Sequence, residues 1–262
     1  MSMRSVIGVI PAAGKGTRIW SLPGSKELFP IGIGTVVKDD KPHQYPKVIS
    51  QHLIESMRQA NVETIYVIIS DGKWDIPSYF GNGKKLDVHI AYLVVDQLFG
   101  MPYSINQAFH WTKSSTVVFG MPDTIFRPRN SLRQLLDQLH ETDADLILGL
   151  YPTNQHSRFG MVQIDEENNV IACIDKPQET ELEYLWGNAC WSPKFSEFLN
   201  KQLIQYELDQ EIEIVLGDYF QQAVEEGLIV KGHKFPDGEY IDIGTFEDLL
   251  LAQTKSFSSE IE

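Results

Sequence analysis

A short apolar run that leads directly into a glycine-containing loop is the feature that most constrains this chain. Residues 6–10 are all apolar or glycine, Pro11 ends the run, and residues 12–18 read Ala-Ala-Gly-Lys-Gly-Thr-Arg. A run of this kind is typical of a strand buried on both faces of a parallel sheet. Small residues after the strand let the backbone approach a ligand, and their consecutive N–H groups can bind an anion. We therefore predict an anion-binding loop at the end of the first strand.

Strand and helix signals alternate through the first 150 residues, which predicts an α/β fold with a mostly parallel sheet and helices on both faces. Strands are expected at 64–69, 88–95, 116–119 and 145–150, and helices at 48–60, at 103–111 and after an N-cap at Ser131.

The pattern changes near residue 151. A polar turn separates the strand-like runs 160–164 and 170–174, which predicts a β-hairpin. A further strand is expected at 184–191, helices after Ser192-Pro193 and along the apolar stripe 212–224, and a strand end at 240–244. Thr245 and Asp248 have the spacing of a capping box for a final helix. We expect this second part to fold back onto the sheet, and we interpret the apolar stripe as core.

Composition narrows the possible partners. The chain has 42% hydrophobic residues and a formal net charge of −14. So acidic a surface repels phosphate backbones, which argues against nucleic acid as a partner. An enzyme with anionic substrates would then need its cations gathered in one cleft.

The cysteines and the first apolar run indicate the compartment. Cys173 and Cys190 lie in hydrophobic stretches without the spacing of a disulfide framework or a zinc site, so we expect buried thiols. The run 6–10 is too short for a signal peptide or a membrane span. We expect a cytoplasmic protein without a membrane partner.

The glycine loop differs from two common nucleotide-binding motifs. It lacks the Gly-Lys-Ser/Thr ending of a Walker A loop and the third glycine of a dinucleotide fingerprint. Arg18 adds a planar charged fork suited to phosphate oxygens, and Lys26 could add a second positive charge. A strand-to-helix turn without a ligand is the alternative interpretation.

Two aspartates could hold a metal ion. Asp123 follows the apolar run 116–119, and the carboxyl ends of strands line the ligand crevice in doubly wound folds. Asp242 stands between two isoleucines near Gly244, where burial without a partner is costly. Mg²⁺ accepts one or two carboxylates together with phosphate oxygens and water. A turn residue and a neighbour of a helix cap are the ordinary alternatives for the two positions.

Residues 12–18 together with Lys26-Glu27-Leu28-Phe29-Pro30-Ile31 resemble the signature of the sugar-phosphate nucleotidyltransferases. The order of motifs extends the resemblance over roughly residues 6 to 250. It implies a Rossmann-like sheet with an inserted sugar-binding lobe. The whole chain, 1–262, would be a single domain, with a nucleotide-binding part of about 1–150 and a sugar-phosphate-binding part of about 151–262.

The resemblance implies an enzyme that joins a nucleoside triphosphate to a sugar 1-phosphate and releases pyrophosphate. Mg²⁺ would assist an in-line attack of the sugar phosphate on the α-phosphorus. The sugar phosphate is already ionised, so no general base is required. The family also includes dimers and tetramers, so a homo-oligomer is possible.

The resemblance also implies roles for individual residues. Arg18 and Lys26 would contact the triphosphate, Asp123 and Asp242 would bind the metal, and Lys176 would hold the sugar's phosphate. The remaining implied nucleotide contacts are Ala12, Ala13, Gly14, Gly16, Thr17, Gly100 and Tyr103, and the remaining sugar contacts are Gly160, Asp175 and Asn188.

Three departures leave alternatives open. The segment between Arg18 and Lys26 is short, which keeps a cytidylyltransferase acting on another phosphorylated small molecule in view. Tyr103 stands where a base-reading glutamine is expected, and Asp175 replaces a glutamate. A non-catalytic regulatory homologue that binds sugar nucleotides is a second hypothesis. A glycosyltransferase is a third, which the missing Asp-x-Asp motif near Asp123 disfavours.

Overall fold

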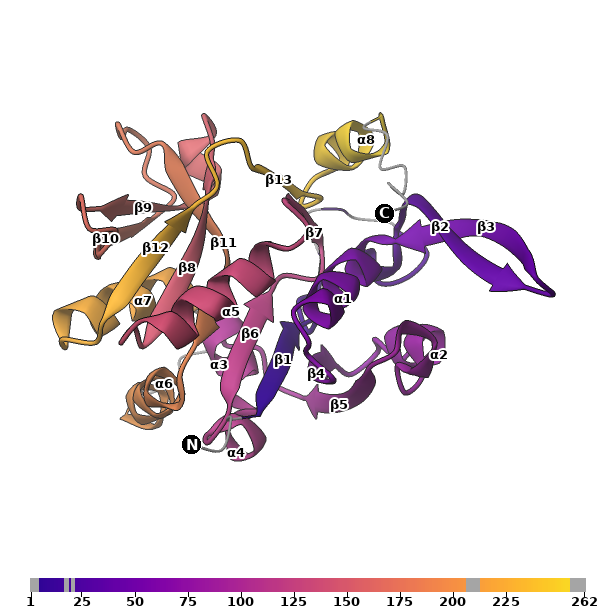
Figure 1. Cartoon of the computed structure of the whole chain (residues 1–262), viewed down its shortest axis with the longest axis horizontal. Helices are drawn as coiled ribbons and strands as arrows, with labels where there is room; N and C mark the ends of the chain where they lie inside the picture. The colour runs from indigo at the N-terminus through magenta and orange to yellow at the C-terminus, as the bar shows by residue number, and fades with distance from the viewer. Residues whose placement is uncertain (1–4, 17–18, 20–21, 206–212, 255–262) are drawn as a thin grey trace.

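The computed structural model describes residues 5–16, 19, 22–205 and 213–254. Its centre is a sheet with helices packed against it (Figure 1). Within the described residues this sheet has nine strands, in the order β10-β9-β11-β6-β1-β4-β5, with β8 pairing β11 and β12. None of the helices in this part of the chain combines the length and apolarity that a membrane span requires.

The first half of the chain supplies the parallel part of the sheet. Its strands are β1 (Val6–Pro11), β4 (Thr64–Ser70), β5 (His89–Val95) and β6 (Thr116–Gly120). β1 pairs in parallel with both β4 and β6, and β4 pairs in parallel with β5. The predicted α/β class is confirmed. In such a sheet the carboxyl ends of the strands share one edge, where ligands bind in open α/β folds.

The second half continues the same sheet. β11 (Tyr184–Trp191) runs antiparallel to β6 and to β8 (Leu146–Pro152). β9 (Gly160–Ile164) and β10 (Val170–Asp175) form the predicted hairpin, and β12 (Val230–Lys234) pairs in parallel with β8. Residues beyond 151 therefore pack onto the first half through strand pairing.

Two hydrophobic cores lie on opposite faces of the sheet. α1 (Ile49–Gln59) and α5 (Ser131–Glu141) cover one face, and α3 (Met101–Asn106), α6 (Pro193–Gln205) and α7 (Leu216–Glu225) cover the other. The strands serve both cores because successive side chains point to opposite faces. Cys173 and Cys190 are buried free thiols, as expected.

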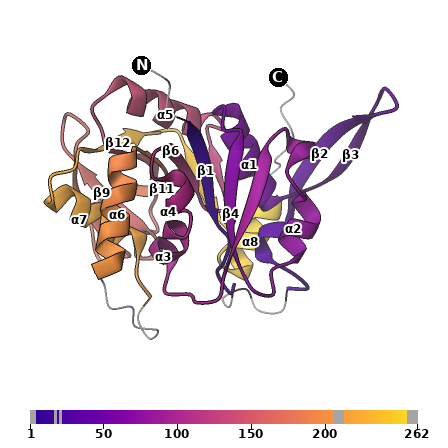
Figure 2. The ribbon, with the colours of Figure 1, turned by 90° about the horizontal axis from the view of Figure 1, so that it is seen from below.

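Two smaller sheets complete the fold. β2 (Pro30–Lys38) and β3 (Lys41–Val48) form a hairpin that projects from the body (Figures 1 and 2). β7 (Thr124–Arg127) pairs antiparallel with β13 (Glu239–Asp242), which leads into α8 (Phe246–Thr254). The shorter elements are α2 (Asp75–Phe80), α4 (Phe109–Thr112), η1 (Lys26–Leu28), η2 (Lys84–Leu86) and η3 (His156–Arg158).

Three local predictions need correction. The helix expected at 103–111 is two short helices, α3 and α4, with a break after Asn106. Ser131 is the first residue of α5 and not its N-cap, which is Asn130; the Ser131 hydroxyl instead accepts a hydrogen bond from Asn188. α7 begins at Leu216, later than the stripe from 212 suggested, because Ile214 pairs with Gly100 across a bridge.

Candidate active site

The glycine loop lies at the carboxyl end of β1. The Ala12 N–H donates to the Ile68 carbonyl at 2.7 Å, so the loop leaves the sheet beside β4. Ala12 and Ala13 are buried, while Gly14 is exposed and an added Cβ there would meet nothing within 4 Å. Open space over an exposed glycine is what close approach of a ligand requires. Thr17 and Arg18 lie outside the described residues.

Lys26 joins this loop to the end of β6. Its side chain passes under Gly16, whose φ of +64° suits glycine and whose added Cβ would lie 3.7 Å from Lys26 Cδ. The ammonium group forms an ion pair with Asp123, and both side chains are largely buried. Burial lowers the pKa of Lys26, but Asp123, Glu27 and Asp242 together raise it above the ordinary value. Lys26 is therefore a permanent cation at the loop.

The two aspartates predicted as metal ligands are brought together by β7 and β13. Asp242 is the register partner of Thr124, which follows Asp123, and the Ile243 N–H donates to the Asp123 carbonyl at 3.1 Å. Tyr240 lies half-buried nearby, and its pKa is raised by burial and by the charges of both carboxylates. Residues more than a hundred positions apart thus share one site.

Glycine at position 244 is explained by the Asp242 carboxylate. A Cβ added to Gly244 would lie 2.6 Å from Asp242 Oδ2. A side chain at position 244 would therefore force the Asp242 carboxylate to move, because the turn after β13 is packed against it.

The chemistry of these two carboxylates fits a divalent cation that keeps open positions. The described residues contain no group of three or more His, Cys, Asp and Glu side chains arranged to hold a metal. An ion held by Asp123 and Asp242 would therefore depend on water and ligand oxygens for its other positions. That is how Mg²⁺ is bound beside phosphates in many enzymes.

Asp175 ends β10, and Lys176 follows it. Asp175 is the register partner of Gly160, and the Lys176 N–H donates to the Phe159 carbonyl at 3.1 Å. Lys176 adopts a φ of +43°, which is uncommon for a residue other than glycine. Its Nζ lies 3.4 Å from Asp175 Oδ2 and its side chain is 53% exposed, so the ammonium group is accessible to a ligand.

Gly160 is explained by Trp186. A Cβ on Gly160 would collide with the indole Nε1 of Trp186, a buried ring of the core. The sugar-binding role implied for Gly160 stays a prediction.

Asn188 lies in the core. Its side chain is fully buried and donates to Ser131 Oγ at 3.2 Å and to the Tyr151 hydroxyl at 2.9 Å. These contacts fix β11 and β8 against the start of α5. They give Asn188 a structural role, and its predicted sugar contact stays untested.

The predicted base-reading segment packs against the residues before α7. A Cβ on Gly100 would collide with the Ile214 carbonyl, and the Ile214 N–H donates to the Phe99 carbonyl at 2.9 Å. Tyr103 is half-buried and packs edge-on against Phe99, with ring centroids 4.9 Å apart. Gly100 is thus required by packing, whether or not a base approaches it.

The sequence did not single out Arg158 as a site residue. Its guanidinium group makes a two-point ion pair with Asp248, which the predicted capping box holds through hydrogen bonds to Thr245. The hydrogen bond to Asp248 raises the pKa of Arg158, and Asp242 contributes by its charge. Arg158 therefore joins the segment before β9 to α8, near the Asp242 carboxylate. Its position directly before a predicted hairpin was the available signal.

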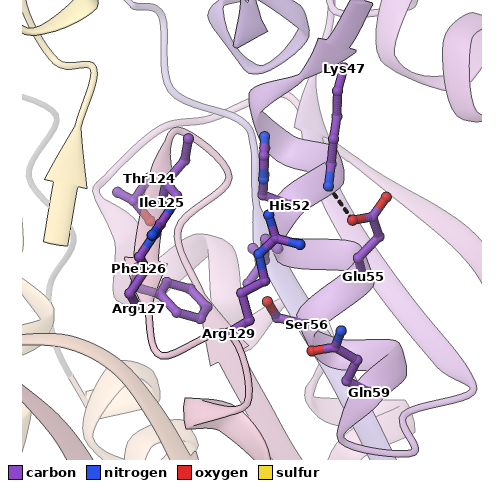
Figure 3. A pocket seen from close by; sticks show the side chains of 11 residues that line it. Lys47, His52, Glu55, Ser56, Gln59, Thr124, Ile125, Phe126, Arg127 and Arg129 are labelled. Atoms are coloured by element: carbon purple, nitrogen blue, oxygen red, sulfur yellow. Dashed lines mark hydrogen bonds and ion pairs between the residues drawn. The ribbon is translucent and has the colours of Figure 1, made fainter. Parts of the chain in front are cut away.

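A separate charged pocket lies between α1 and β7 (Figure 3). Lys47 points to Glu55 there, with Arg129 beside them (Figure 3). His52 lines the same pocket, and its pKa falls to about 4 because of burial and the nearby Lys47 and Arg129 charges. None of the predicted site residues that the structure describes lines this pocket.

Comparison with known proteins places this arrangement in a family. Residues 7–259 match the Nucleotidyl transferase family. The chain belongs to this family. The glycine loop, Lys26 and the two aspartates, Asp123 and Asp242, gather at one edge of the sheet, and this arrangement is consistent with a nucleotidyl transferase.

Relatives among characterised proteins are distant. The chain is 24% identical over 249 residues to the low-salt glycan biosynthesis nucleotidyltransferase Agl11 of Haloferax volcanii, covering 94% of this chain and 64% of that protein. It is 26% identical to the bifunctional protein GlmU of Methanococcus maripaludis, covering 94% and 53%. It is 25% identical to a UTP–glucose-1-phosphate uridylyltransferase of Synechocystis, covering 97% and 64%. The chain thus spans between about half and two thirds of the length of these nucleotidyl transferase relatives.

Solved structures share the fold. A protein from Bacillus anthracis described as a putative glucose-1-phosphate thymidylyltransferase superimposes with a TM-score of 0.79 at 20% identity, covering 95% of this chain and 94% of that one. A UDP-glucose pyrophosphorylase bound to UDP-glucose gives 0.75 at 19% identity, covering 95% and 97%. At these identities the likeness shows that the nucleotidyl transferase fold is shared.

Proposed function

We propose that this chain is a sugar-1-phosphate nucleotidylyltransferase, which makes a nucleoside diphosphate sugar and pyrophosphate from a nucleoside triphosphate and a sugar 1-phosphate. The observation that carries the proposal is the cluster of Lys26, Asp123 and Asp242 at the glycine loop. The names of the uridylyltransferase and thymidylyltransferase relatives support this substrate class.

The triphosphate would bind with its phosphates over the glycine loop. The exposed backbone at Gly14 leaves room for phosphate oxygens, and Lys26 supplies a positive charge beneath them. Without substrate this charge is paired with Asp123. We infer that Lys26 turns from Asp123 to the triphosphate when substrate binds, and Arg18 would assist it.

Asp123 and Asp242 would hold Mg²⁺. Bound there, Mg²⁺ would neutralise charge on the α-phosphate. The departure of Lys26 would leave the Asp123 carboxylate without its ion-pair partner, and that favours binding of a divalent ion at the same place. The negative charge of Asp123 is thus balanced by Lys26 in the free protein and would be balanced by Mg²⁺ in the bound protein.

Lys176 would orient the second substrate. Its exposed ammonium group on the edge of the β9–β10 lobe can hold the phosphate of the sugar. An oxygen of that phosphate attacks the α-phosphorus, the bond from the α-phosphorus to the bridging oxygen breaks, and pyrophosphate leaves. The nucleophile is ionised near neutral pH, so catalysis would come from alignment and from stabilisation of charge.

The cellular setting is part of the proposal. Two buried free thiols and a net charge of −14 support a cytoplasmic protein that binds neither membrane nor nucleic acid. The relatives do not fix an oligomeric state, and a homo-oligomer is compatible with the fold.

The test is pyrophosphate release from a matrix of five nucleoside triphosphates and a panel of sugar 1-phosphates with Mg²⁺. Variants Asp123→Asn and Asp242→Asn should each lower turnover by at least a hundredfold, on the order seen when a charge-stabilising group is removed. Asp137→Asn, on the exposed face of α5, is the matched control. Turnover unaffected by both active-site changes would refute the metal assignment.

A second candidate is a regulatory homologue that binds sugar nucleotides without turnover. The replacement of the expected base-reading glutamine by Tyr103, which packs on Phe99, is the observation that favours it. Binding of a nucleotide sugar with no pyrophosphate release from any pair would support this candidate. Release with CTP and a phosphorylated compound other than a sugar would instead support a cytidylyltransferase.

A further inference from the structure

The first turn of α7 lies beside the residues predicted to bind sugar. α7 packs along β10, which ends at Asp175. A hydrogen bond from the Cys173 N–H to Gln221 Oε1, at 2.8 Å, holds helix and strand together. The apolar stripe of α7 is core, as expected, but its first turn carries Gly217 and the exposed Asp218.

One indole ring fixes where this turn lies. A Cβ on Gly217 would be 3.6 Å from Trp186 Nε1, the same atom against which Gly160 packs. Asp218 follows Gly217, and Asp175 is the register partner of Gly160. Asp175 and Asp218 therefore each lie next to a glycine that packs against Trp186 Nε1.

The two carboxylates influence each other. The pKa of Asp218 is raised by partial burial and by the negative charge of Asp175. Within the described part of the chain, the Asp218 carboxylate has no hydrogen-bond or ion-pair partner, and Asp175 has only Lys176 at 3.4 Å. Ionised carboxylates accept hydrogen bonds and donate none. The pair thus forms a small acceptor-only surface next to the lysine proposed to hold the sugar's phosphate.

This surface is also tied to the proposed nucleotide site. Ile214, two residues before α7, is bridged to Gly100, and its N–H donates to the Phe99 carbonyl. The start of α7 is therefore fixed between the segment proposed to bind the base and the strand that carries the proposed sugar-binding residues.

We propose that Asp218 is a specificity-determining residue for the sugar, and that it acts with Asp175 by accepting hydrogen bonds from neighbouring ring hydroxyls. This inference rests on the proposed function. The ligand class is a sugar 1-phosphate that presents at least two hydroxyl donors to this surface. A deoxy analogue lacks one hydroxyl, so one carboxylate would lose its water without gaining a hydrogen-bond donor. The analogue should therefore have a lower kcat/KM than the sugar 1-phosphate itself.

The experiment compares wild-type protein, Asp218→Asn and a control, Glu225→Gln, which changes an exposed acid on the same helix. The kcat/KM is measured for the best sugar 1-phosphate and for each of its monodeoxy analogues, and the KM is measured for the triphosphate. Thermal unfolding of each variant shows that the fold is retained.

Wild-type protein and Glu225→Gln should discriminate against at least one monodeoxy analogue by roughly ten- to a hundredfold, the range for a hydrogen bond to a charged group. Asp218→Asn should reduce that discrimination to about threefold or less, raise the KM for the sugar phosphate and leave the triphosphate KM unchanged. Discrimination that persists in Asp218→Asn for every analogue overturns the inference. A wild-type protein without turnover overturns the proposed function itself, so the two failures are distinguishable.

Discussion

The buried ion pair between Glu27 and Lys73 gives a sharp test of how the site is held. Glu27 is 2% exposed, the Lys73 side chain is 11% exposed, and Lys73 Nζ lies 2.7 Å from Glu27 Oε1. The Glu27 carbonyl accepts from Ser50 Oγ at 2.6 Å, and Lys26 is the preceding residue. The pair therefore anchors the short η1 turn that presents Lys26 to Asp123.

Lys73→Met should destabilise the fold by about 3 kcal/mol at pH 7.5. Breaking a buried pair and leaving one charge costs about 3–5 kcal/mol, and the slight exposure of Lys73 favours the lower end. Glu27 Oε2 already has no partner among the described residues, so the mutant carboxylate would have none at either oxygen.

The loss should depend on pH. Burial raises the pKa of Glu27 above its ordinary value against the opposing effect of Lys73. Because the folded pKa is the higher one, folding favours the protonated acid, and stability falls as the pH rises through that pKa. Removal of Lys73 raises the folded pKa further. The cost of Lys73→Met should therefore be largest at neutral pH and shrink as the pH falls toward the ordinary value near 4.5.

Urea unfolding at pH 7.5 and pH 5 measures both effects. Arg133→Met, which removes the exposed pair with Asp137, is the control and should cost about 0.5 kcal/mol or less. The double variant Glu27→Gln/Lys73→Met should recover most of the loss. A Lys73→Met cost below about 1 kcal/mol, or an equal cost at both pH values, would refute the reasoning.

Three further changes test other parts of the structure. The pKa of His52 is about 4 in the fold, below its ordinary value of 6.5, so the free energy of unfolding should fall by at most about 3 kcal/mol as the pH drops from 6.5 to 4. In urea unfolding, His52→Gln should make stability depend less on pH over this range. An unchanged pH dependence would contradict the argument from burial. Gly100→Ala should cost about 2 kcal/mol or more, because the added Cβ meets the Ile214 carbonyl at a φ of +119°. Gly14→Ala should change stability by less than about 0.5 kcal/mol, since its Cβ meets nothing within 4 Å, yet it should lower turnover by entering the space proposed for phosphate. Full activity in Gly14→Ala would argue against ligand binding there.

Predictions that rest on local chemistry agree with the structure. The hairpin of β9 and β10 and the strand 184–191 match because alternation and a polar turn specify them locally. The Thr245–Asp248 capping box is present, with the Thr245 N–H donating to Asp248 at 3.1 Å and the Asp248 N–H donating to Thr245 at 3.3 Å. Such signals are contained within a few residues.

Two features of the secondary structure were not predicted correctly. The helix expected at 103–111 breaks into two short helices, although its apolar pattern continues. The β2–β3 hairpin was missed because its turn uses Asp39 and Asp40 at positive φ in place of the usual Asn-Gly. Its exposed strands also carry no core pattern.

Some residues of the candidate site could be identified from the sequence, and others only from the structure. Lys26, Asp123 and Asp242 could be selected from motifs, and the structure brings them together through β7 and β13. Arg158 and Asp218 could not, since only the fold brings Arg158 to Asp248 and Asp218 near Asp175, residues that are far away in sequence. Pairing of distant charges follows from sheet topology, which no local pattern encodes.

The most direct test of the central claim follows the α-phosphate itself. The protein is incubated with Mg²⁺, a sugar 1-phosphate and a nucleoside triphosphate labelled on its α-phosphorus, and the products are separated. The account predicts that the label moves into a nucleoside diphosphate sugar, with unlabelled pyrophosphate formed in equal amount, and that Asp123→Asn abolishes both. Label recovered in free nucleoside mono- or diphosphate, or transfer that survives Asp123→Asn, would contradict it.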